Sequence, residues 1–183
     1  MQKKEKPTIS LAFLLAITMP MLLVNLTVPL IGEPLHTALE HFLDAYLVDD
    51  IGFWSSKLPL SSKITTNYIA LTGPIAGAIL LFRNCKRIDT IKKDLQRNSA
   101  IKIMATAFAF LLLCLFFAHQ AYFNSVDLAI RNEKLRIAGQ NFLFYTLFSS
   151  SILLYIAFTP VCIFLLMVCF YYRIIEPLAK KVM

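Results

Sequence analysis

Charged side chains are scarce in this sequence. Asp, Glu, Lys and Arg make up 16% of its 183 residues, whereas soluble domains contain roughly 25%. Hydrophobic residues make up 58%, and four stretches with almost no charge are each long enough to cross a hydrocarbon core about 30 Å thick. The composition excludes an ordinary water-soluble domain. It predicts an integral membrane protein in which residues 1–183 form a single membrane domain.

Patterns that build catalytic and cofactor sites are also missing. The sequence has no phosphate-binding loop and no dinucleotide fingerprint. The serines of the fourth apolar stretch have no histidine within the spans to activate them, other than His119 at the end of a span. No charged residue lies at the centre of a span, which argues against an ion-coupled transporter or a proton channel. We therefore predict that the chain is not an enzyme and binds no cofactor.

Metal ligands do not form a complete set. The four cysteines, which we interpret as small hydrophobic side chains, show neither a C-x-x-C pair nor a disulfide framework; they are Cys85, Cys114, Cys162 and Cys169. His36, Glu40 and Asp44 share one helical face and could bind a metal ion. However, His41 lies on another face, and no second cluster completes the ligands. We expect a solvated acidic face and no metal.

The formal net charge is +7, which in a soluble protein would suggest a nucleic-acid partner. Here the basic residues lie beside the apolar stretches, where orientation in the membrane and contact with anionic lipid explain them better. No basic stripe is interleaved with exposed aromatic residues. We therefore expect membrane lipid, and no nucleic acid, as a partner.

The apolar stretches predict an all-α fold, a four-transmembrane-helix bundle with spans at about residues 11–31, 64–82, 100–119 and 144–166. The basic leader and first span could pass for a signal peptide, but the apolar run is too long and no cleavage site follows it. The fourth stretch, Gln140–Tyr172, would reach about 50 Å as a straight helix. Tilting, a kink near Pro160 or projection past the headgroups must absorb the excess.

The largest segment outside the spans runs from Gly32 to Ser62 and is acidic. Its apolar residues recur at helical spacing, at Leu35, Leu39, Phe42, Leu43 and Leu47. This pattern predicts an amphipathic helix in the first extracytoplasmic loop, suited to the membrane surface. Phe53 and Trp54 follow it, and we expect them to be interfacial aromatic anchors.

Lysine and arginine lie mostly on one side of the predicted topology. Only five of the 18 belong to the first and last loops between spans, namely Lys57, Lys63, Arg131, Lys134 and Arg136. The other thirteen belong to the leader, the middle loop, the start of the third span and the tail. The positive-inside rule therefore places the middle loop and both termini in the cytoplasm.

The second span contains Gly73-x-x-x-Gly77, a spacing that lets two helix backbones approach closely. Pro74 interrupts this motif and is expected to kink the helix. Two interpretations remain, packing among the four spans, which we favour, and a docking face for the helix of a partner. Three hydroxyls in the fourth stretch could serve either purpose, those of Ser149, Ser150 and Ser151.

The order of these parts resembles the immunity proteins that protect bacteria from pore-forming bacteriocins, of the colicin A type. The resemblance covers most of the chain, from the basic leader and long outer loop to the basic loop Arg83–Arg97 and the basic tail. Its short motifs are Leu71-Thr72-Gly73-Pro74 and Phe158-Thr159-Pro160-Val161. It implies a multi-pass protein of the bacterial inner membrane that binds the inserted hydrophobic helices of a toxin and blocks channel opening. The contacts would then include Gly73, Gly77, Ser149, Ser150 and Ser151, with the cytoplasmic loop as a second surface.

Two other functions fit the same residues. The chain could be a small structural subunit of a larger inner-membrane assembly, such as a secretion or conjugation apparatus. It could also be an exclusion protein of a conjugative plasmid, which is likewise small and acts by recognition. In each case the partner is expected to be the transmembrane helices of another protein.

Overall fold

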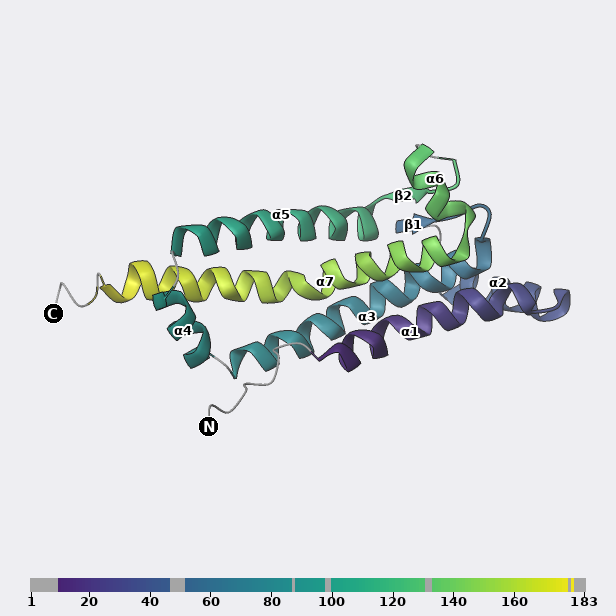
Figure 1. Ribbon diagram of the computed structural model, residues 1–183. Helices are drawn as coiled ribbons and strands as arrows, with labels where there is room; N and C mark the ends of the chain where they lie inside the picture. Colours follow the sequence, from purple (N-terminus) through teal and green to yellow (C-terminus); the bar gives the residue numbers. More distant parts are fainter. Residues whose placement is uncertain are drawn as a thin grey trace.

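Four long helices dominate the computed structural model (Figure 1). The structure describes residues 10–46, 52–86, 88–97, 100–130, 133–177 and 179. The long helices are α1 (Leu11–Thr27), α3 (Pro59–Cys85), α5 (Ala100–Phe123) and α7 (Phe142–Phe170). Each is long and apolar enough to cross a membrane, once the 3-10 turn Val28–Leu30 is counted with α1. The four predicted spans are therefore confirmed as helices.

Shorter elements lie at the two ends of the molecule (Figure 1). They are α2 (Glu33–Tyr46), β1 (Gly52–Trp54), α4 (Ile88–Arg97), β2 (Ser125–Asp127) and α6 (Glu133–Gln140). We call the end with α4 the α4 end, and the end with the two strands the sheet end. Several predictions concern residues outside the described ranges, namely those for Lys3, Lys4, Lys6, Leu47, Arg87, Arg131, Lys180 and Lys181.

The other long helices are arranged around α7. α1 and α3 pack against α7 and against each other, while α5 packs mainly against α7 from another side (Figure 1). The buried core contains Met21 of α1, Leu80 of α3, and Leu153 and Ala157 of α7. The expected bundle is therefore a three-helix core with α5 attached along one side of α7.

α7 stays helical through Pro160, so the kink that was one of the expected solutions for its length would bend the helix without ending it. It continues as a π-helix over Tyr171–Ile175 and extends past the ends of α3 and α5 (Figure 1). Ile88 and Ile91 of α4 pack against this extension around Val168. The extension of α7 therefore helps to hold α4, whose isoleucines lie in the same cluster as Ile103 and Met104 of α5.

Polar side chains join the three core helices near the sheet end. Asn25 of α1 is buried, and its Nδ2 donates a hydrogen bond of 2.9 Å to Thr146 Oγ1 of α7. Thr65 Oγ1 of α3 donates to Asn25 Oδ1 at 3.5 Å. Tyr68 Oη donates to the carbonyl oxygen of Ile17 at 2.9 Å. Such interhelical bonds stabilise membrane proteins by about 0.6–2 kcal/mol each, so they add specificity to the apolar packing.

The sequence pattern missed the two strands. β1 and β2 form a parallel pair in which Phe53 lies opposite Val126. Phe53 is buried between Phe117 and Phe148, and its carbonyl oxygen accepts a hydrogen bond of 2.9 Å from Tyr145 Oη. The prediction that Phe53 is an interfacial anchor is therefore wrong, because the strand pairing turns this ring into the core.

The amphipathic helix predicted in the first long loop is confirmed as α2. Leu39 and Leu43 pack against Val28 and Leu60, at the junction of α1 and α3. Lys63 Nζ of α3 lies 2.5 Å from Asp44 Oδ1. This ion pair holds the C-terminal end of α2 against α3. The helix is thus anchored to the protein itself as well as being amphipathic.

Candidate helix-recognition surfaces

Gly73 and Gly77 are the first candidates, and both are buried where α3 crosses α7. A Cβ atom built at Gly73 would lie 2.7 Å from Ile156 Cγ2, and one at Gly77 would lie 2.9 Å from Pro160 Cγ. The close approach of backbones that the spacing predicts therefore occurs between α3 and α7. This supports the interpretation of intramolecular packing, because a partner helix would have to displace α7 to reach either glycine.

The three serines of α7 face different surroundings. Ser149 is buried, Ser150 is half-buried and Ser151 is exposed. Ser151 Oγ already donates a hydrogen bond of 2.9 Å to the Leu147 carbonyl oxygen of its own helix. The hydroxyls therefore do not form one polar surface, and Ser151 is the member of the trio that a partner could reach most easily.

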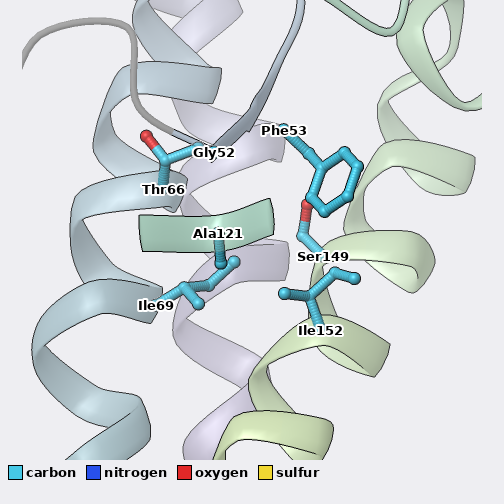
Figure 2. Close-up of a pocket in the computed structure, with 7 residues that line it drawn as sticks. All are labelled: Gly52, Phe53, Thr66, Ile69, Ala121, Ser149 and Ile152. Atoms are coloured by element: carbon cyan, nitrogen blue, oxygen red, sulfur yellow. The ribbon is translucent and has the colours of Figure 1, made fainter. Parts of the chain in front are cut away.

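Ser149 lines a small cavity among α3, α5, α7 and β1 (Figure 2). The cavity has a volume of about 10 Å³, which is near the minimum for one water molecule. Its lining residues are Gly52, Phe53, Thr66, Ile69, Ala121, Ser149 and Ile152. None of them carries an acid, a base or a thiol, so the cavity offers packing space rather than catalytic chemistry.

The most exposed of the long helices is α5. Seven of its residues recur at helical spacing on the side turned away from α7, and we call them the outer face of α5. They are Ile101, Ala105, Phe108, Leu112, Phe116, His119 and Phe123, all exposed. The opposite side packs on α7, where the rings of Phe117 and Tyr155 stack with centroids 4.6 Å apart. Apart from His119, the outer face is thus an apolar strip along the whole helix.

Sequence reasoning missed this face, although one signal could have indicated it. Ala105 and Ala109 are small residues four positions apart, and both are exposed. This spacing permits close helix approach in the same way as the glycine motif. Because α5 is apolar all round, the pattern alone did not indicate which side lacks a partner within the chain.

A native cysteine pair offers a test of how α5 is placed. Cys114 of α5 and Cys162 of α7 are both buried and close enough to interact. In a chain with Cys85→Ser and Cys169→Ser, we expect copper phenanthroline to join the two sulfurs. Trypsin cleavage near Arg136 should then leave the α5 and α7 fragments joined on a non-reducing gel. A further Cys114→Ser substitution should let them separate, and separation without it would contradict the α5–α7 packing.

The acidic row of α2 does not gather a metal site. His36 Nδ1 lies 4.0 Å from Glu40 Oε2, and Asp44 is engaged by Lys63. Within the described ranges, no group of three or more His, Cys, Asp or Glu side chains could hold a metal ion. The row therefore contains a histidine–carboxylate contact within α2 and one ion pair between α2 and α3.

In comparisons with known proteins, no family model, curated protein or solved structure matches the chain.

Proposed function

We propose that this chain is an inner-membrane immunity protein that binds the inserted hydrophobic helices of a pore-forming bacteriocin and blocks channel opening. The single observation that carries the proposal is the outer face of α5, an apolar strip that no other part of the described chain covers. The order of parts and the two short motifs resemble the colicin A type. Within this proposal the docking surface moves from the glycines of α3 to α5.

The binding free energy required to keep a channel closed is larger than one residue can contribute, so an extended contact face is needed. Shifting a channel from 99% open to 99% closed requires about 5.5 kcal/mol of preferential binding to the closed state. Apolar side chains in a membrane attract a partner helix mainly by van der Waals packing, which contributes only about 0.1–0.2 kcal/mol per pair of atoms, so many contacts must act together. The outer face of α5 is long enough to make many such contacts with one helix. Mismatched side chains along the same strip would reject the helices of other toxins.

The proposed orientation places the α4 end in the cytoplasm. Arg83, Lys86, Lys93 and Lys102 are exposed at this end, as the positive-inside rule requires. Cys85 is also exposed there, whereas the other three cysteines are buried. We expect a membrane-impermeant maleimide to label Cys85 only after the inner membrane is permeabilised. A chain with Cys85→Ser and Lys57→Cys should be labelled in intact spheroplasts, and the reverse pattern would invert the topology.

Expression of the chain alone in a sensitive strain tests the proposed function. We expect survival against one pore-forming bacteriocin of a panel and full sensitivity to the others, scored by the toxin concentration that kills half of the cells. Sensitivity to every toxin, with reduced uptake of a related plasmid, would identify an exclusion protein instead. If the chain neither protects against a toxin nor reduces plasmid uptake, and it co-purifies with a large complex, it would be identified as a structural subunit.

A further inference from the structure

A second exposed apolar strip lies on α3, and two basic side chains stand at one of its ends. Leu71, Ile75, Ile79 and Phe82 are exposed and follow one another at helical spacing. From Leu71 to Phe82 the strip is about 16 Å long at 1.5 Å per residue. This is about half of a hydrocarbon core of about 30 Å, which is the depth of one leaflet. The strip therefore has the length of one lipid acyl chain.

Two cations stand at the α4 end of this strip. The Arg83 guanidinium lies 5.4 Å from the ring centroid of Phe13, and Lys86 Nζ lies 4.4 Å from that of Phe82. Both side chains are exposed, and in the part of the chain that the structure describes no carboxylate pairs with either. The rings hold the two charges beside the apolar strip, where cation–π contacts contribute about 0.5–1 kcal/mol each.

The surroundings of these cations are also positive. The described side chains at the α4 end include six cations, namely Arg83, Lys86, Lys92, Lys93, Lys102 and Arg173. Two carboxylates oppose them, Asp89 and Glu176, and the Glu176 carboxylate lies 3.9 Å from Lys92 Nζ. The ion pair therefore lies between α4 and α7, and among the described side chains neither of the two carboxylates is paired with Arg83 or Lys86.

We propose that α3 binds an anionic phospholipid, with an acyl chain along Leu71–Phe82 and the headgroup phosphate at Arg83 and Lys86. A basic group at the membrane surface contributes a factor of about five in affinity for anionic lipid. A zwitterionic headgroup would bring its own ammonium group toward the two cations, so the site favours a headgroup with net negative charge. The proposal requires membrane insertion but does not rest on the immunity function.

Native mass spectrometry of the full chain, released from detergent, tests this site. Phosphatidylglycerol and phosphatidylcholine with identical acyl chains are titrated separately, and the dissociation constant of the first bound lipid is compared. We expect phosphatidylglycerol to bind at least about tenfold more tightly. Arg83→Gln with Lys86→Gln should weaken phosphatidylglycerol about 25-fold and leave phosphatidylcholine within twofold. Inorganic phosphate at about 10 mM should displace neither lipid.

The matched control is a pair of exposed cations at the sheet end, Lys57→Gln with Arg136→Gln, which should change either affinity less than twofold. The charge-preserving pair Arg83→Lys with Lys86→Arg should keep most of the preference, which separates charge from local structure. Equal binding of the two lipids by the unaltered chain would overturn the proposal. So would an equal loss in the sheet-end pair, or displacement of the lipid by phosphate.

Discussion

Substitution of Gly77 by leucine is expected to lower the free energy of unfolding by about 3 kcal/mol or more. Even the first added atom, Cβ, would lie 2.9 Å from Pro160 Cγ and 3.1 Å from the Ala157 carbonyl oxygen. One neighbour is a rigid ring and the other is backbone, so neither can rotate aside. Inserting methylenes into a packed interface costs about 1–3 kcal/mol and sometimes more. Here the whole side chain must push α3 and α7 apart.

Unfolding of the purified chain in mixed micelles, followed by circular dichroism, measures this loss. The control is Ala78→Leu, one residue along the same helix but exposed, which should change the free energy of unfolding by less than about 0.5 kcal/mol. Gly73→Ala should also be costly, because a Cβ there would lie 2.7 Å from Cγ2 and 3.3 Å from Cβ of Ile156, a β-branched side chain whose χ1 is restricted in a helix. Equal effects of leucine at positions 77 and 78 would mean that α3 does not pack on α7 through its glycines.

The long helices were predictable because composition alone identifies a span, but the start of α3 was not. The sequence places the second span at about residue 64, whereas α3 begins at Pro59. Ser61 and Ser62 lie before the predicted span, yet both are buried, as is Thr65 just inside it. Ser62 Oγ donates to the carbonyl oxygen of Pro59 at 2.9 Å, and Thr65 Oγ1 donates to Asn25 Oδ1. Only the tertiary contacts show that this polar stretch is helical and enclosed.

The two strands could not be predicted for a different reason. Each has three residues, which is too short for an alternating pattern, and Gly52 pairs with Ser125, 73 positions later in the sequence. Gly52 has a φ of 80°, and a Cβ there would lie 3.0 Å from the Ala121 carbonyl oxygen. The left-handed backbone of Gly52 and its close approach to α5 therefore could not be predicted from the sequence.

The candidate surfaces were predictable only in part. The glycine spacing correctly indicated close helix packing, but the same spacing serves an internal neighbour and an external partner equally well. The internal neighbour is favoured here because Ile156 and Pro160 of α7 occupy the space beside the glycines. The outer face of α5 could not be predicted from the sequence for a different reason. A helix surrounded by lipid is apolar on every side, so its sequence does not distinguish the face against α7 from the free one.

Under the proposed immunity function, truncation of the outer face of α5 is expected to abolish most of the protection against the bacteriocin that the chain would recognise. Phe108→Ala with Leu112→Ala removes two large side chains from the middle of the strip, where contact residues usually contribute most to binding. A combined loss of about 2–3 kcal/mol corresponds to a 30- to 150-fold weaker complex. The toxin concentration that kills half of the cells should fall by at least about tenfold at equal expression. Because both side chains are exposed, the free energy of unfolding should change little.

The control for this pair is Met19→Ala with Leu23→Ala, which truncates two similarly exposed side chains one helical turn apart on α1. The two pairs have the same apolar character and differ in the helix that presents them. A loss of protection confined to the α5 pair therefore identifies a recognition surface rather than a general need for apolar contact with lipid. If both pairs reduce protection equally, α5 has no special role in binding. If neither pair reduces it while Ser151→Leu does, the toxin contacts α7 instead.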